Sequence, residues 1–285
     1  MKIGVTAAFS HRTEPGYIAQ AVRLYETAGF HSIWVPEHVV FFADYDSKYP
    51  YSDSGRIPGE PDGVLDPFTA LTYIAAHTDK IRLGTGICLV PQRQPIYTAK
   101  MVADLDYLSN GRVDFGVGIG WLREEFDVLQ MDFDKRNRRC LEYIEAIRAL
   151  WQPGLSSYQG ETLNITPCHL NPKPVQQLPP VYFGGESNAA LRRVATHGDG
   201  WYGFNLSPEK LAERLQRLDQ LLQEANRSRA DVKIYVGPNT QPVTPETVAA
   251  YRELGVEQLL LPVMAGSLDK LKARIDKARA QTDMN

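Results

Sequence analysis

The chain has 285 residues, 43% of them hydrophobic and 23% charged, and a formal net charge of -3 at pH 7. This composition is that of an ordinary globular enzyme and excludes a disordered or fibrous chain. The slightly negative charge gives no reason to expect nucleic acid or an anionic membrane as a partner.

The three cysteines Cys88, Cys140 and Cys168 are an odd number without metal-ligand spacing. We therefore expect neither a disulfide framework nor a bound metal, and a reducing compartment fits this cysteine content. The first residues become polar too soon for a signal peptide, and no apolar run approaches membrane-spanning length. A cytoplasmic location without membrane contact is the expectation.

Eight short apolar segments predict β-strands, and amphipathic helices separate them. The expected strands are 2–8, 32–36, 81–86, 113–119, 180–184, 200–204, 232–237 and 258–262. Helical spacing of apolar residues is clear in four of the intervening segments, at Ile18, Val22 and Tyr25; Ile144, Ile147 and Trp151; Leu211, Leu215, Leu218 and Leu222; and Leu268, Leu271 and Ile275. Asp66, Ser187 and Ser207 stand where helix N-caps are expected.

Strand and helix alternate eight times without a break in composition, which predicts an α/β fold in which parallel strands close into a (β/α)8 TIM barrel. Barrels of this kind routinely reach this length as one domain, so we expect a single domain over residues 1–285. An open doubly wound sheet is the main alternative.

Two segments exceed the minimal repeat. Residues 39–65, after the second strand, are rich in aromatic residues, proline and glycine, including Pro58 and Gly59, and lie on the face where barrels place active sites. They resemble a pocket wall or a lid. Residues 152–177, before the fifth strand, form a second insertion that starts on the opposite face, although its length would let it cross the end of the barrel.

Two strand ends carry glycines next to helix starts. Gly184, Gly185, Glu186, Ser187 and Asn188 precede a helical run, where close backbone approach and the helix N-terminus favour a phosphate. The alternative is a tight turn with Ser187 as an ordinary cap. In the phosphate interpretation the Glu186 carboxylate has to point away from the anion.

The fourth strand ends in Gly118, Ile119, Gly120 and Trp121. Trp121 can stack on a ring of a cofactor or substrate, and packing at a strand-helix junction is the alternative. The following Arg123, Glu124 and Glu125 are expected to form a solvated first helical turn.

Glu37 and His38 end the second strand and open the aromatic insertion. A histidine at this position can stabilise a developing charge or donate a hydrogen bond to a carbonyl oxygen. The alternative is a loop histidine satisfied by Glu37 or by the backbone.

Several of these segments together resemble the bacterial luciferase-like superfamily. The segments that carry the resemblance are 32–38 (SIWVPEH), 81–87 (IRLGTGI), 108–121 (LSNGRVDFGVGIGW), 181–187 (VYFGGES) and 198–201 (GDGW). Matched segments in this order are more specific than any single motif.

The resemblance implies an eight-stranded barrel that holds flavin mononucleotide (FMN) or the deazaflavin coenzyme F420 at its C-terminal rim. The 121–126 segment (WLREEF) and the Pro-Glu-His ending of the second strand look most like the deazaflavin-dependent branch. It also implies a cis peptide bond between Gly86 and Ile87 behind the ring, and a homodimer. In the sugar-phosphate dehydrogenase branch a glutamate that acts as an acid occupies the position of Trp121. That proton donor is missing here, so the substrate and mechanism of that branch are not expected.

On this basis the chain is expected to be an F420-dependent oxidoreductase that transfers hydride between the deazaflavin and a small organic substrate, with His38 as the catalytic residue. The alternatives are an FMN-dependent monooxygenase served by a flavin reductase, and a flavin-binding protein without catalysis. The residues expected to contact the cofactor are Glu37, His38, Gly86, Ile87, Gly118, Gly120, Trp121, Gly184, Gly185, Glu186, Ser187 and Asn188.

Overall fold

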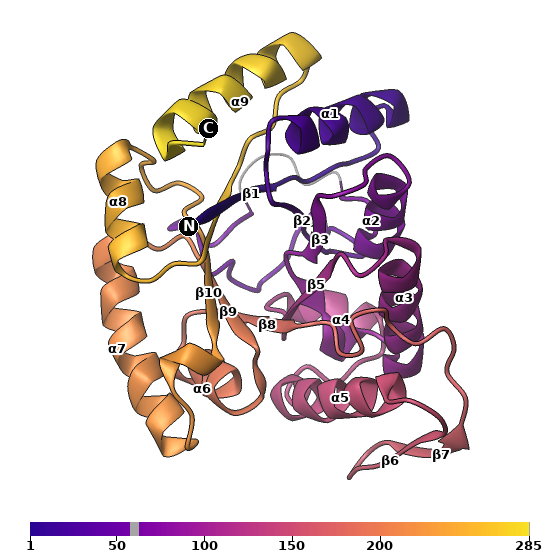
Figure 1. Cartoon of the computed structure of the whole chain (residues 1–285). Coiled ribbons are helices and arrows are strands. Elements are labelled where there is room, and N and C mark those ends of the chain that lie inside the picture. The colour runs from indigo at the N-terminus through magenta and orange to yellow at the C-terminus, as the bar shows by residue number, and fades with distance from the viewer. Residues whose placement is uncertain (58–62, 285) are drawn as a thin grey trace.

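The computed structural model describes residues 1–57 and 63–284, and its central feature is a closed barrel of eight parallel strands (Figure 1). The barrel closes where β3 pairs with β5, with Leu83 opposite Val113 and Gly84 opposite Asp114. The predicted TIM barrel is therefore confirmed, and the open sheet is not formed. The eight strands are β1 (Lys2–Thr6), β2 (Ser32–Val35), β3 (Arg82–Thr85), β5 (Val113–Gly118), β8 (Val181–Gly184), β9 (Gly200–Phe204), β10 (Lys233–Gly237) and β11 (Gln258–Leu261).

Helices surround the barrel and bury the apolar faces that the sequence predicts. The predicted caps are confirmed, since Asp66, Ser187 and Ser207 each accept a hydrogen bond from the backbone N–H three residues later. No helix among residues 1–57 and 63–284 is long and apolar enough to cross a membrane. The helices are α1 (Pro15–Thr27), α2 (Pro67–Ala75), α3 (Pro95–Leu108), α4 (Arg123–Val128), α5 (Arg136–Trp151), α6 (Asn188–His197), α7 (Pro208–Glu224), α8 (Pro245–Glu253) and α9 (Leu268–Thr282), with short 3-10 turns at Val90–Gln92 and Arg229–Asp231.

Aromatic side chains fill the inside of the barrel. Trp34 packs against three tyrosines and Leu260 in a buried cluster, and the rings of Tyr182 and Tyr235 stack with centroids 4.4 Å apart. Gly84 and Gly116 make room for the indole, because a Cβ on Gly84 would collide with it and one on Gly116 would lie 2.7 Å from its Cζ3. The barrel is thus a packed core, and its C-terminal rim is the place left for a ligand.

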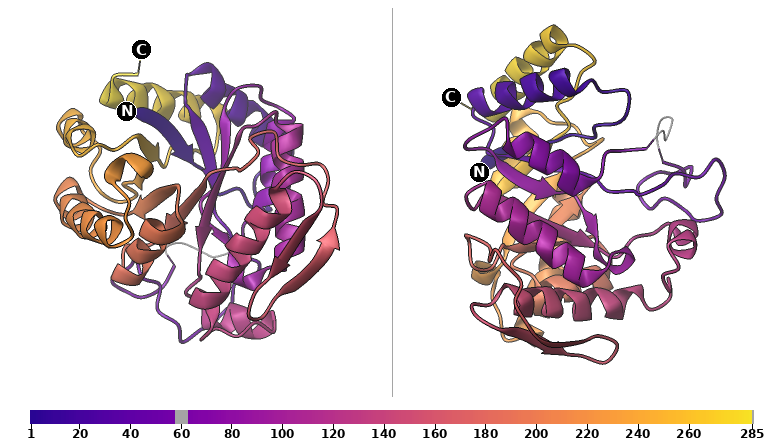
Figure 2. Two further views of the ribbon diagram at one scale, coloured as in Figure 1. Left: turned by 60° about the horizontal axis from the view of Figure 1, so that its bottom comes forward. Right: turned by 90° about the vertical axis from the view of Figure 1, so that its right-hand side faces the viewer.

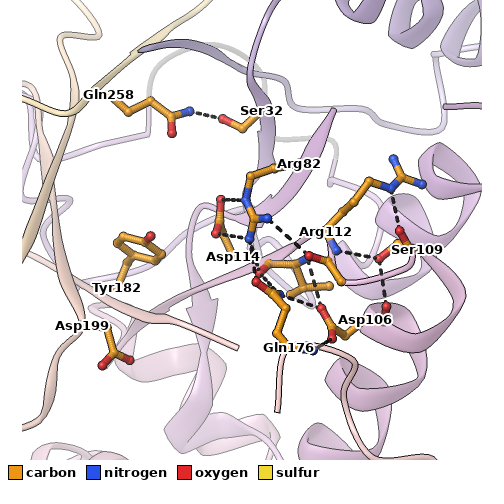
Figure 3. Close-up of polar contacts among 12 residues, drawn as sticks. Ser32, Arg82, Asp106, Ser109, Arg112, Asp114, Gln176, Tyr182, Asp199 and Gln258 are labelled. Atoms are coloured by element: carbon orange, nitrogen blue, oxygen red, sulfur yellow. Dashed lines mark hydrogen bonds and ion pairs between the residues drawn. The ribbon is translucent and has the colours of Figure 1, made fainter. Parts of the chain in front are cut away.

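A buried polar network closes the N-terminal end of the barrel (Figure 3). Arg82 donates two hydrogen bonds to the carboxylate of Asp114, at 3.0 and 2.7 Å, and a third to Gln176 Oε1 at 3.1 Å. Gln176 Nε2 in turn donates to Asp106 Oδ1 at 2.7 Å and to the Val113 carbonyl at 2.8 Å. Gln176 belongs to the second insertion, so this network attaches that insertion to α3 and β5.

The two insertions lie in different places. The second forms a hairpin that the sequence did not predict, β6 (Ser156–Gln159) and β7 (Asn164–Cys168), and it packs alongside α5, where Glu142 accepts hydrogen bonds from the amides of Thr162 and Leu163. The first insertion projects past the C-terminal ends of the strands, as predicted (Figure 2, right). Its residues 58–62, including Pro58 and Gly59, lie outside the described residues.

His31, which precedes β2 at the N-terminal end, should make the protein less stable in mild acid. Burial, together with Lys2, Arg82 and Lys233, lowers the pKa of His31 from 6.5 to about 4. As the pH falls, His31 of the unfolded chain therefore takes up a proton before His31 of the folded chain does. Stability is lost as the pH falls from the pKa of the unfolded state toward that of the folded state. After allowing for the partial exposure of the ring, we expect a loss of about 1 kcal/mol between pH 7 and about pH 5.

Urea unfolding at the two pH values measures this loss. The variant His31→Gln cannot titrate at this position, so its stability should fall less over the same interval. An equal fall in the variant and the unmodified protein would contradict the assignment.

Candidate active site

Ile87 forms an apolar wall at the C-terminal rim. The peptide bond between Gly86 and Ile87 is cis, as the resemblance implies, and the short strand β4 (Cys88–Leu89) follows it and pairs with β5. The Ile87 side chain covers the glycines at the ends of β5 and β8: a Cβ on Gly118 would collide with its Cδ1, and one on Gly184 would lie 2.7 Å from it. These two glycines therefore contribute to a site through Ile87, and their direct contact with a ring stays a prediction.

His38 lies at the rim beside Trp121 and at the root of the first insertion. Its side chain is 14% exposed, and its ring lies 4.9 Å from the ring of Phe41 and 5.9 Å from that of Trp121. Its Nδ1 is 3.1 Å from Glu125 Oε2. The structure thus brings together His38 and Trp121, two predicted site residues from different strands.

The expectation that Arg123, Glu124 and Glu125 form a solvated turn is wrong for Glu125, whereas Arg123 is exposed and Glu124 is half-buried. The Glu125 side chain is fully buried, and it shares a buried face of α4 and its N-cap with Leu122 and Phe126. The same spacing is present in the sequence and could have revealed it. Glu124 accepts hydrogen bonds from the amides of Asp46 and Ser47 in the insertion.

Glu37 holds the chain near β4 in place. Its carboxylate forms an ion pair with Arg93 and accepts a hydrogen bond from the Leu89 amide at 2.5 Å. Arg93 also pairs with Asp66, the N-cap of α2. Both Glu37 oxygens are therefore engaged by the protein, and the contact of Glu37 with a cofactor stays a prediction.

The glycine turn after β8 presents the N-terminus of α6. Gly185 has a φ of +100°, a conformation that favours glycine, and its carbonyl accepts a hydrogen bond from Trp201 Nε1 at 2.9 Å. Ser187 caps α6, and the first-turn amides of an α-helix have no carbonyl partner within the helix. Ser187 and Asn188 are exposed, and Arg214 donates to Asn188 Oδ1 at 2.6 Å, which adds positive charge beside this N-terminus.

Glu186 does not obstruct this N-terminus. Its carboxylate accepts hydrogen bonds from the Phe204 amide and from the Tyr51 hydroxyl, both at 2.8 Å. Burial raises the pKa of Glu186, although these hydrogen bonds oppose the change. Its carboxylate is therefore held by β9 and the insertion, and the turn is left open to an anion.

The aromatic residues of the first insertion lie across the rim. Tyr45 and Tyr49 pack on Trp121 with ring centroids 5.7 and 5.2 Å away, and Tyr51 packs on Phe204 at 4.9 Å. The segment thus extends from the end of β5 to the end of β9. This is the arrangement expected of a pocket wall or lid.

Gly120 shapes the turn that carries Trp121. It has a φ of +77°, and a Cβ at this position would lie 2.7 Å from the ring of Phe126. Its carbonyl accepts a hydrogen bond from Arg136 Nε at 3.3 Å. Gly120 therefore positions Trp121, and its own contact with a cofactor stays a prediction.

A closed (β/α)8 barrel with an apolar wall, a histidine and an open helix N-terminus at its rim is the architecture of barrel enzymes that act on small molecules. The family model described as luciferase-like monooxygenase matches residues 1–284. The chain belongs to this luciferase-like family of oxidoreductases and monooxygenases.

One relative and two solved structures resemble this chain over nearly its whole length. The uncharacterized protein Rv0953c of Mycobacterium tuberculosis is 32% identical over 265 residues, which cover 92% of this chain and 93% of that protein. The monooxygenase RslO1 from Streptomyces bottropensis superposes with a TM-score of 0.76 at 20% identity, over 99% of this chain and 98% of that one. An F420-dependent secondary alcohol dehydrogenase in complex with an F420-acetone adduct gives 0.75 at 17% identity over the same shares. At these identities the two solved structures show a shared fold.

Proposed function

We propose that this protein is an oxidoreductase that transfers hydride between the deazaflavin coenzyme F420 and a small organic substrate. The observation that carries the proposal is the position of Ile87, whose side chain lies across the ends of β5 and β8 and offers an apolar wall to one face of a flat ring. The sequence of the second strand end and of α4 favours the deazaflavin over FMN.

The residues at the rim fit a phosphorylated ring. Ser187, Asn188 and the first turn of α6 would hold the phosphate, since this turn is exposed and the Glu186 carboxylate is engaged elsewhere. Ile87 would support the ring, and Trp121 and the insertion would enclose the substrate. A bound deazaflavin supplies a two-electron hydride carrier.

The protein's own contribution is binding, orientation and charge stabilisation. His38 is placed at the rim to stabilise the charge that develops on a substrate oxygen during transfer. The aromatic insertion would shield the reacting groups from water, which strengthens such electrostatic effects.

An FMN-dependent monooxygenase on the same scaffold, served by a separate reductase, is the second candidate. The description of the family and the similarity to RslO1 favour it. Ser187, Asn188 and the first turn of α6, which we call the phosphate turn, would also hold the phosphate of FMN, and Ile87 would also support its ring. The residues at the rim therefore suit both cofactors.

Titration of the purified protein with each cofactor tests the proposal. We expect the deazaflavin to bind in the micromolar range and its absorbance to bleach when a panel of alcohols is added. Binding of FMN without binding of the deazaflavin, with oxygen consumed when reduced FMN is supplied, would replace the proposal by the second candidate. Binding without turnover across a broad panel would favour a non-catalytic flavin-binding protein.

Gly118→Ala should weaken cofactor binding about tenfold, or about 1.4 kcal/mol. The added Cβ collides with Ile87 Cδ1 and forces the wall toward the ring. Dissociation constants from the same titration measure the effect. In an Ile87→Val background Cδ1 is absent, so the penalty of the glycine substitution should be smaller. An equal penalty in both backgrounds would contradict the role of Ile87.

A further inference from the structure

We propose that Glu125 is a positioning residue that fixes the tautomer of His38, so that Nδ1 carries the proton and Nε2 is left as the proton acceptor at the rim. This inference rests on the proposed function, in which His38 acts on the substrate. It assigns a role to a buried carboxylate that does not itself reach the rim.

The Glu125 carboxylate is surrounded by hydrogen-bond donors. Its Oε1 accepts from the backbone amides of Val39 at 2.7 Å and Val40 at 3.3 Å. Its Oε2 lies 3.1 Å from His38 Nδ1 and accepts from Gln92 Nε2 at 3.0 Å. The carboxylate therefore joins the end of β2, the turn after β4 and the start of α4 at one fully buried point.

Glu125 acts as an acceptor at neutral pH. Burial alone would raise its pKa, but the hydrogen bonds from His38, Gln92 and the Val39 amide outweigh burial and lower it. An ionised carboxylate has no proton to donate, so the nitrogen that faces it has to carry one. His38 Nδ1 is consequently the N–H of the neutral ring, and Nε2 keeps the lone pair.

This tautomer decides what His38 can do. When a substrate hydroxyl is oxidised to a carbonyl, the adjacent C–H bond breaks, and the hydride leaves for the two-electron carrier of the proposed function. The O–H bond also breaks, and its proton passes to Nε2, giving an imidazolium whose Nδ1–H is held by Glu125. In the opposite direction the same Nε2–H returns the proton to the oxygen.

Nitrogen-15 NMR of histidine-labelled, ligand-free protein tests the tautomer without any turnover. His38→Gln identifies the His38 signals by their disappearance. We expect the neutral ring to show a protonated Nδ1 and an unprotonated Nε2. A neutral ring protonated at Nε2 would overturn the inference, and this measurement needs no Glu125 variant that folds.

Glu125→Gln should invert the tautomer. The amides of Val39 and Val40 are fixed donors, so the new carboxamide turns its oxygen toward them and its NH2 toward His38 and Gln92. Nδ1 then has to accept, and the proton moves to Nε2. Gln92 can adapt, since in the structure its buried Oε1 has no hydrogen-bond partner. An unchanged tautomer in Glu125→Gln would overturn the inference.

Glu124→Gln is the matched control. It removes the same charge one residue earlier on the same helix, and Glu124 bonds to the amides of Asp46 and Ser47 in the insertion. We expect the His38 tautomer to be unchanged in this variant. A tautomer that inverts here as well would assign the effect to charge loss in general and overturn the specific role of Glu125.

Turnover gives the second readout. Loss of the carboxylate that orients a catalytic imidazole lowers kcat by up to about 10⁴-fold elsewhere, and we expect at least about 100-fold for Glu125→Gln with cofactor affinity unchanged. Inversion of the tautomer with full turnover would overturn the positioning role. Failure of the proposed function would give a different result. The His38 tautomer would be as expected, but His38→Ala would not lower turnover.

Discussion

His38→Ala is expected to lower turnover by about 10²- to 10³-fold and to leave the affinity for the cofactor nearly unchanged. The His38 ring packs against Phe41 and Trp121 and its Nδ1 faces Glu125, which leaves Nε2 without a hydrogen bond from the described residues and available to the reacting group. Removing it deletes a proton acceptor and leaves Ile87 and the phosphate turn intact. Steady-state turnover and cofactor titration on the same preparation separate the two effects.

The matched control is His169→Ala, because His169 is exposed in the second insertion and lies outside the rim. Its turnover should equal that of the unmodified protein. If His38→Ala also kept full turnover, His38 would have no part in the chemistry. A loss of cofactor affinity equal to the loss of turnover would instead assign His38 to binding.

Arg82→Leu is expected to lower the free energy of unfolding by about 3 kcal/mol, because it strands the charge of Asp114 in the core. Asp114 is almost fully buried, and Arg82 supplies both of its side-chain hydrogen bonds (Figure 3). Gln176 loses a donor as well, so the attachment of the second insertion is weakened. Urea unfolding measures the change.

Two comparisons isolate this buried pair. Replacing both partners, Arg82→Leu with Asp114→Leu, removes the stranded charge and should recover part of the stability that the single variant loses. Lys135→Ala breaks an exposed pair with Asp132 and should change stability by less than about 1 kcal/mol. If Arg82→Leu also changed stability by less than about 1 kcal/mol, water would have to reach Asp114, and the network would add little to the free energy of unfolding.

Most of the fold could be predicted from the sequence because the signals are local. Each barrel strand is a short apolar run beside a helix with regular apolar spacing, and caps such as Asp66 and Ser187 mark where helices begin. The Ser187 turn could be predicted for the same reason. By contrast, β4 and the β6–β7 hairpin are short or exposed and have no clear alternation.

The polar partners could not be predicted because they join distant parts of the chain. Arg82 pairs with Asp114 and Gln176, and Glu37 pairs with Arg93, across separations that no local period encodes. Glu125 is different, since its spacing from Leu122 and Phe126 indicates a buried face. A carboxylate on such a face calls for hydrogen-bond donors, but the identity of those donors, His38 and Gln92, depends on contacts between distant parts of the chain.

The root of the first insertion is fixed next to His38. Glu125 accepts hydrogen bonds from the Val39 and Val40 amides, and the Phe41 ring packs on His38. Residues 42–57, which we call the tip, reach the rest of the rim through ring contacts, the bonds from the Asp46 and Ser47 amides to Glu124, and the bond from Tyr51 to Glu186. Exchange of this tip for another sequence would therefore change which molecules are admitted without moving the imidazole. Within this single loop, the tip would thus determine which substrates enter, and the root would hold the reactive His38. The tip is therefore the segment to change in order to redirect the enzyme to new substrates.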